Sequence, residues 1–110
     1  DEVPSYEVHI EPIVKRYCLS CHRPGKKNNN YFMSTYEEVM TSGDHAPNVI
    51  PGDLSSNLMR MINREEIEAG GPMPPTKALP PELVEIFTRW VKAGAPNTAT
   101  EASTLQPTAP

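Results

Sequence analysis

The stretch Cys18-Leu19-Ser20-Cys21-His22 is the part of this 110-residue chain from which its fold can be worked out. On a helix, positions i, i+3 and i+4 lie on one face, so Cys18, Cys21 and His22 are presented side by side. The chain has 2 cysteines, both in this stretch, so it cannot form the set of disulfides that holds many small secreted proteins together. The two thiols and the imidazole are therefore expected to bind one group.

The pattern C-x-x-C-H is the attachment sequence of c-type haem. Both thiols can add to vinyl groups on one edge of the porphyrin while the imidazole faces the iron. This predicts one covalent haem c bound by Cys18 and Cys21, with His22 as an iron ligand. A zinc site would need a further ligand from His9 or His45, and a thioredoxin-like dithiol would need a βαβ pattern that the chain lacks. Haem also supplies the large apolar body that a small chain with 37% hydrophobic residues needs.

The second axial position of the iron decides between electron transfer and small-molecule chemistry, and Met73 is the expected ligand there. It lies in the stretch 70–75, Gly-Gly-Pro-Met-Pro-Pro, where Pro74 favours an extended Met73 and the glycines allow a tight loop. The other methionines occupy places where this residue commonly fills gaps in a core. They are Met33, Met40, Met59 and Met61. His45, which would give a bis-histidine haem, and an open distal site remain the alternatives.

Other polar side chains are candidate partners of the haem propionates. Trp90 can donate its indole N–H to a propionate, but its place in an apolar stripe favours packing against the first helix. Arg60 and Arg64 can pair with a propionate, and each is expected to be a surface charge. His9, on the polar side of the first helix, is expected to be exposed.

Apolar periodicity and capping signals predict an all-α fold, with one domain over residues 1–97. The expected helices run over residues 5–22, from a capping box at Ser34-Thr35-Tyr36-Glu37 to Ser42-Gly43, from a cap at Asp53 to Asn63, and from Pro81 to Gly94. Loops are expected over residues 24–33 and 70–75. Residues 98–110 have no apolar face, which predicts a disordered Thr/Ala/Pro-rich tail or linker.

Charge is unevenly distributed along the chain, whose formal net charge is −4. Residues 15–27 contain no acid and hold Lys15, Arg16, Arg23, Lys26 and Lys27, whereas residues 31–70 hold seven acids against two arginines. This distribution predicts a dipolar surface that steers charged partners, unless both groups are only solvated faces. An acidic chain without an aromatic and basic face is not expected to bind nucleic acid. No apolar run is long enough to span a membrane.

Taken together, these motifs resemble the class I c-type cytochromes over residues 5–97. The matching pieces, in order along the chain, are Pro12-Ile13, Cys18 to His22, Pro51-Gly52-Asp53, Met73-Pro74-Pro75 and Trp90-Val91-Lys92-Ala93-Gly94-Ala95. The resemblance implies a small cytochrome c fold. In that fold the N- and C-terminal helices cross, short helices and loops wrap around one covalent haem, and Met73 is the distal ligand.

The resemblance also implies a function. A haem with His and Met ligands carries single electrons rather than acting as an enzyme, as a soluble carrier or as the haem module of a larger respiratory or dehydrogenase protein. Its partners would be redox proteins, such as membrane respiratory complexes or a fused oxidoreductase. A periplasmic or cell-surface location is expected, because c-type haem is attached outside the cytoplasmic membrane. A haem enzyme or a ligand-binding sensor with an open or labile distal site is the alternative.

Overall fold

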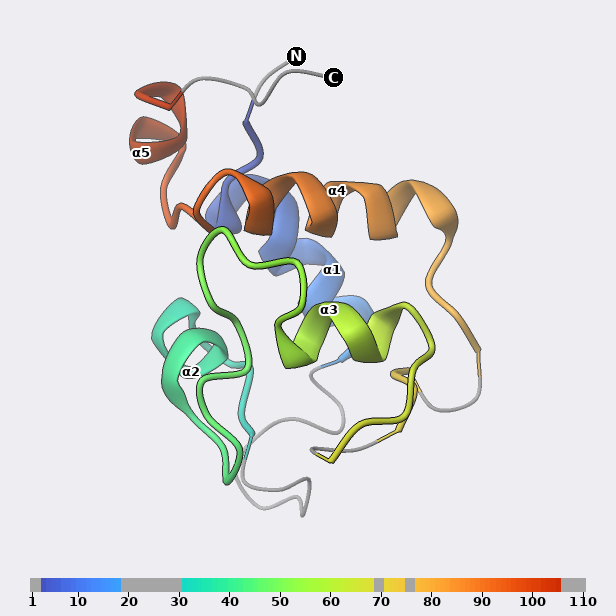
Figure 1. The fold of residues 1–110 in the computed structure, drawn as a ribbon. Coiled ribbons are helices and arrows are strands. Elements are labelled where there is room, and N and C mark those ends of the chain that lie inside the picture. The colour runs from blue at the N-terminus through green and yellow to red at the C-terminus, as the bar shows by residue number, and fades with distance from the viewer. Residues whose placement is uncertain (1–2, 19–30, 69–70, 75–76, 106–110) are drawn as a thin grey trace.

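The computed structural model describes residues 3–18, 31–68, 71–74 and 77–105, and these residues form helices joined by loops (Figure 1). In chain order the elements are the π-helix η1 (Tyr6–Ile10) and the α-helices α1 (Glu11–Tyr17), α2 (Tyr36–Thr41), α3 (Asn57–Ile62), α4 (Pro81–Lys92) and α5 (Ala99–Ser103). No β-sheet occurs in these four ranges, and the predicted all-α class is confirmed. Within the same ranges, every helix is too short or too polar to cross a membrane.

The first helix begins where its periodicity predicts, as η1 running directly into α1. Ser5 caps it, because its hydroxyl accepts a hydrogen bond from the Val8 N–H at 3.2 Å. Pro12 lies in the first turn of α1, where the π-helix η1 changes into an α-helix, and it has no N–H to donate to the preceding turn. The prediction is confirmed as far as Tyr17, and its part over residues 19–22 lies outside the described residues.

Helix α2 begins one residue later than predicted. Its cap is Thr35, whose hydroxyl accepts from the Glu38 N–H at 3.1 Å, while the Glu38 carboxylate accepts from the Ser34 N–H at 3.0 Å. The box predicted on Ser34 and Glu37 is therefore wrong by one position. The observed register places Val39 in the core with no exposed surface, and this burial selects between two adjacent caps that are otherwise similar.

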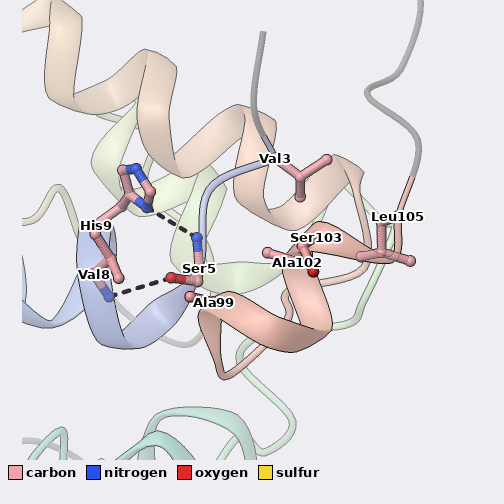
Figure 2. A pocket seen from close by; sticks show the side chains of 8 residues that line it. All are labelled: Val3, Ser5, Val8, His9, Ala99, Ala102, Ser103 and Leu105. Atoms are coloured by element: carbon pink, nitrogen blue, oxygen red, sulfur yellow. Dashed lines mark hydrogen bonds between the residues drawn. The ribbon is translucent and has the colours of Figure 1, made fainter.

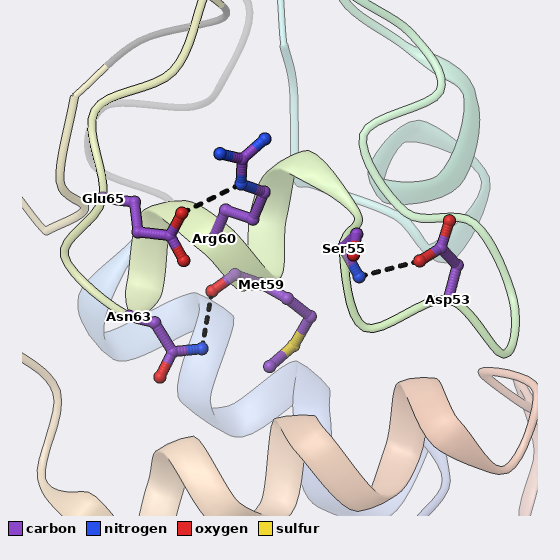
Figure 3. A network of polar contacts seen from close by, with 6 residues as sticks. All are labelled: Asp53, Ser55, Met59, Arg60, Asn63 and Glu65. Atoms are coloured by element: carbon purple, nitrogen blue, oxygen red, sulfur yellow. Dashed lines mark hydrogen bonds and ion pairs between the residues drawn. The ribbon is translucent and has the colours of Figure 1, made fainter.

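Asp53 does not cap α3, contrary to the sequence prediction. Its carboxylate accepts from the Ser55 N–H at 2.8 Å (Figure 3), which stabilises the turn before the helix. The N-cap position belongs to Ser56, whose hydroxyl instead accepts from the Ile50 N–H at 2.8 Å and donates to the Asp53 carbonyl at 2.6 Å. A tertiary hydrogen bond to the preceding loop thus replaces a local cap.

Helix α4 follows its prediction closely. Pro81 occupies its first position, and the apolar stripe is buried at Phe87, Trp90 and Val91. Beyond the last turn, the Gly94 N–H donates to the Val91 carbonyl at 3.0 Å and the Ala95 N–H to the Trp90 carbonyl at 2.8 Å. This is a Schellman motif, and Gly94 has the positive φ of 110° that the motif requires.

The first helix crosses behind α4 (Figure 1) and is bound to the segment that follows α4. The Tyr6 N–H donates to the Pro96 carbonyl, and the Glu7 N–H to the Asn97 carbonyl, both at 2.9 Å. The Tyr6 ring lies 6.3 Å from the Trp90 ring, centroid to centroid, and Tyr6 itself is only 3% exposed. The crossing of the first and last helices that the resemblance implies is present.

Helix α5 is a correction to the sequence analysis, which predicts disorder from residue 98. Thr98 caps it by accepting from the Glu101 N–H at 3.0 Å, and the Glu7 carboxylate accepts from the Ala99 N–H at 2.7 Å. Ala102 is buried against the first helix, beside a pocket of about 400 Å³ (Figure 2). The helix is held by one small buried side chain and by two capping hydrogen bonds, so the sequence contains no apolar stripe from which it could be predicted. The prediction is wrong for residues 98–105, and residues 106–110 lie outside the described part.

Removal of the hydroxyl group is expected to change the free energy of unfolding differently at Tyr6 and at Tyr36. The Tyr6 hydroxyl is buried with no hydrogen-bond partner among the described residues, whereas the Tyr36 hydroxyl donates to the Ala95 carbonyl at 2.7 Å. Tyr6→Phe should leave the free energy of unfolding unchanged or raise it by about 1 kcal/mol, and Tyr36→Phe should lower it by about 1 kcal/mol. Denaturant unfolding of the haem-loaded protein at neutral pH measures both. Equal losses in the two variants would contradict the assignment.

The same hydroxyl predicts a loss of stability at high pH. Burial raises the pKa of Tyr6 to about 12 from 10.0, and the charges of Glu11 and Glu38 act in the same direction. The unfolded chain releases this proton near pH 10 and the folded protein only near pH 12, so stability falls as the pH rises through this window. Between about pH 9 and about pH 11, Tyr6→Phe should lose about 1 kcal/mol less than the parent protein. Parallel curves for the two proteins would refute this.

Candidate functional site

The first cysteine of the attachment motif lies directly after α1. The Cys18 N–H donates to the Val14 carbonyl at 2.9 Å, so the helical hydrogen bonding extends to this residue. Its side chain is half-buried and packs against the hydrophobic core. Cys21 and His22 lie outside the described residues, so their positions remain predictions. Helix α1 thus presents the first predicted attachment thiol at its C-terminal end, accessible to a ligand on one side.

Two tyrosines lie close to Cys18. Tyr31 is buried and its hydroxyl donates to the Val39 carbonyl at 2.7 Å. Burial raises the pKa of Tyr31 far above its usual value, and the negative charge of a Cys18 thiolate raises it further. Cys18 contributes in the same way to the raised pKa of Tyr6. Cys18 packs against the buried cluster to which both aromatic rings belong, and such an apolar and aromatic surface suits contact with a flat apolar ligand.

Met73 lies in a non-helical segment, as predicted, within the described residues 71–74. Its own N–H donates to the Met61 carbonyl at 3.0 Å, and the Arg64 guanidinium donates through Nη1 to the Pro74 carbonyl at 2.5 Å. The Met73–Pro74 peptide bond is cis. Both hydrogen bonds lead to the C-terminal end of α3, so this helix end holds the loop on either side of the Met73 side chain.

Most of the other methionines fill the core. Met33, Met59 and Met61 are 2%, 1% and 6% exposed, as expected for residues that pack between helices. Met40 is half-buried in α2 and packs against the core. Met73 is also half-buried but is not part of this cluster. Its thioether is accordingly not committed to the core of the described residues.

The other two histidines lie in different parts of the fold, His9 in η1 and His45 between α2 and α3. His45 is half-buried in the loop between α2 and α3, where its carbonyl accepts from the Asn57 side-chain amide at 3.3 Å. His9 is half-buried rather than exposed as expected, because its Nδ1 accepts from the Ser5 N–H at 3.0 Å (Figure 2). This hydrogen bond fixes the His9 ring beside α5, at the beginning of the first helix.

The propionate candidates have protein partners instead. The Trp90 indole N–H donates to the Pro96 carbonyl at 2.9 Å, so its expected packing role is confirmed. Arg60 is exposed and pairs with Glu65 at 3.0 Å (Figure 3), which confirms it as a surface charge. The same expectation is wrong for Arg64, which binds the Pro74 carbonyl. Sequence reasoning missed this contact, because no local pattern links a helix end to a loop ten residues later.

The described part of the site fits the haem that the motif predicts. Cys18 offers a half-buried thiol at a helix end, packed against the core, and Met73 offers a half-buried thioether on a loop that is hydrogen-bonded to α3. Thiols form the covalent links of c-type haem, and a thioether is a common axial ligand of its iron. The chemistry of these donors therefore agrees with a cytochrome.

Comparison with known proteins gives one match. A family model described as Planctomycete cytochrome C matches residues 18–77, which begin at Cys18 and extend past Met73. No curated protein and no solved structure matches the chain. The matched residues make up more than half of the 110 and include the attachment motif, α2, α3 and the Met73 loop. The protein therefore belongs to the planctomycete cytochrome c family and is a haem-binding electron-transfer protein of the c type.

Proposed function

We propose that this protein carries single electrons through one haem c that is attached to Cys18 and Cys21 and ligated by His22 and Met73. The observation that carries the proposal is the Met73 loop, which is fixed to α3 on both sides of a side chain that the core does not use. A ligand held in this way can stay on the iron in both oxidation states. The bound haem supplies the one-electron chemistry, and the chain supplies its attachment, ligands and surroundings.

Attachment requires the two thiols to reach the haem together. Each thiol adds across a vinyl double bond, so that the sulfur bonds to one carbon and the hydrogen passes to the other. Cys18 is positioned for this step by its place after α1, where its N–H continues the helical hydrogen bonding to Val14. His22 follows Cys21 directly, so attachment of the Cys21 thiol would keep the imidazole near the iron.

The proposed ligand pair favours an electron carrier over an enzyme. Six-coordinate iron with His22 and Met73 leaves no position for a substrate, and a thioether ligand raises the reduction potential. A haem enzyme or a gas sensor would require the Met73 sulfur to leave the iron. The hydrogen bonds of the Met73 N–H and of the Pro74 carbonyl to the end of α3 oppose this movement. These alternatives are outcomes of the test below.

Partners and location follow from the same proposal. Lys15 and Arg16 are exposed on the last turns of α1, next to the proposed attachment site, and the Lys15–Glu11 pair at 3.9 Å is a weak surface contact. We expect a redox protein with an acidic surface to dock here, as a separate partner or as a fused oxidoreductase. The protein would act in the periplasm or at the cell surface, where c-type haem is attached, and would not bind nucleic acid.

The first prediction concerns the axial ligand. The oxidised protein should show the weak absorption band at about 695 nm that marks sulfur ligation of iron(III). Met73→Ala should abolish this band and lower the reduction potential. Met40→Ala, which removes a half-buried methionine packed on the core, should keep the band and the wild-type reduction potential. Optical spectra and redox titration measure the two quantities. A wild-type spectrum without the band, high-spin iron, or binding of cyanide as fast as in Met73→Ala would overturn the assignment.

The second prediction concerns attachment. Cys18→Ala should leave the haem bound through Cys21 alone, because the remaining thioether is still covalent. The pyridine haemochrome spectrum should move to longer wavelength, since one vinyl group stays unsaturated. Haem should remain with the denatured chain on a gel in Cys18→Ala but be extracted by acidic organic solvent from the variant lacking both cysteines. Extraction from the single variant would show that Cys21 is not an attachment point.

A further inference from the structure

The chain leaves helix α3 through Arg64, whose positive φ is unusual for a residue with a long side chain. The Arg64 N–H donates to the Met61 carbonyl and the Glu65 N–H to the Arg60 carbonyl, both at 3.0 Å. These are the two hydrogen bonds of a Schellman motif, and Arg64 has a φ of 70°. The motif that ends α4 has the same hydrogen bonds but places Gly94 at this position.

The comparison of the two helix ends shows that Arg64 is a strained choice. An L-residue with a side chain loses backbone energy at positive φ, and glycine avoids this loss. Asparagine is the other residue often found there. Backbone strain of this kind persists where the surrounding structure offsets it, so the Arg64 guanidinium is expected to make such a contact.

The Arg64 side chain reaches the loop that carries Met73. Its Nη1 donates to the Pro74 carbonyl at 2.5 Å. The Met61 carbonyl, which accepts the Arg64 N–H, also accepts the Met73 N–H at 3.0 Å. The end of α3 therefore binds the backbone on both sides of the Met73 side chain, at the Met73 N–H and at the Pro74 carbonyl. The left-handed backbone at Arg64 and the hydrogen bond to Pro74 belong to one structural unit.

We propose that Arg64 is a positioning residue that keeps the thioether of Met73 on the haem iron. The inference rests on the proposed role of Met73 as an axial ligand. Arg64 does not touch the iron in this scheme. It limits how often the loop opens, because Met73 can leave only when the segment that includes Pro74 moves away from α3. Loss of the guanidinium removes a charged donor, and the hydrogen bond from the Met73 N–H to Met61 is then left, within the described residues, between this helix end and the loop.

Imidazole is the probe for loop opening. Its nitrogen can bind iron(III) only after the Met73 sulfur has left, so its apparent affinity measures the fraction of molecules with an open loop. Arg64→Gln should raise the imidazole affinity of the oxidised protein by about tenfold. Arg64→Lys, which retains a charged donor, should restore part of the difference.

Arg60→Gln is the matched control. Arg60 belongs to α3, carries the same charge and pairs with Glu65 at the surface, and its side chain has no hydrogen bond to the described loop residues 71–74. This variant should change the imidazole affinity by less than about twofold, because an exposed ion pair contributes little. If Arg64→Gln and Arg60→Gln show the same affinity, the effect is only one of net charge and the proposal is wrong.

Arg64→Gly separates positioning from fold stability. Glycine suits the positive φ, so the melting temperature of this variant should equal or exceed that of Arg64→Gln, while its imidazole affinity should rise as much. Imidazole affinity that simply follows the melting temperature would refute a positioning role. A wild-type protein without sulfur ligation would refute the proposed function itself, whereas normal ligation with unchanged affinity in Arg64→Gln would refute only this inference.

Discussion

The carbonyl of Pro96 joins the first and last helices, and the arrangement of the other elements depends on this joint. It accepts the Tyr6 N–H and the Trp90 indole N–H, each at 2.9 Å, so it binds the beginning of η1 and the last turn of α4 at once. The carbonyl reaches this place because the chain reverses at Gly94 and Ala95, which both have positive φ. Tight packing of Tyr6 against Trp90 and Tyr36 keeps water away from these hydrogen bonds.

The direction of α1 follows from this joint, and the direction of α1 decides where Cys18 lies. Ile10 is completely buried, and the 7 residues of α1, Glu11–Tyr17, connect it to Cys18. Cys18 is therefore carried to the edge of the core that contains Tyr31, where its side chain packs against the buried cluster. A covalent ligand attached at this point would gain its position from the helix crossing.

A second carbonyl, that of Met61, has a similar role at the other side of the proposed site. It accepts two N–H groups, one from the end of α3 and one from the loop that carries Met73. In both places a helix ends in a Schellman motif, and a carbonyl at or shortly after this end, that of Met61 or that of Pro96, binds a segment distant in sequence. Helices α3 and α4 contribute to one buried cluster, so the ligand loop is held by the core that holds the helix crossing. The residues are Leu58, Met59 and Ile62 of α3 and Phe87, Trp90 and Val91 of α4.

Sequence alone determined the helical class, the extent of the long helix α4 and the family, because these depend on local signals: apolar periodicity, Pro81 and Gly94 at the helix ends, and the C-x-x-C-H pattern. It failed where two local signals were nearly equal or where none existed. The cap of α2 was displaced to Thr35 by the burial of Val39, and Asp53 lost its cap role because Ser56 bound a distant loop. Helix α5 and the hydrogen bond from Arg64 to Pro74 were decided only by the tertiary structure, since each depends on groups that meet in space after the helices have packed. Local pattern specifies which elements form, and the energy of burying them together specifies which polar groups are then left to hold the functional loop.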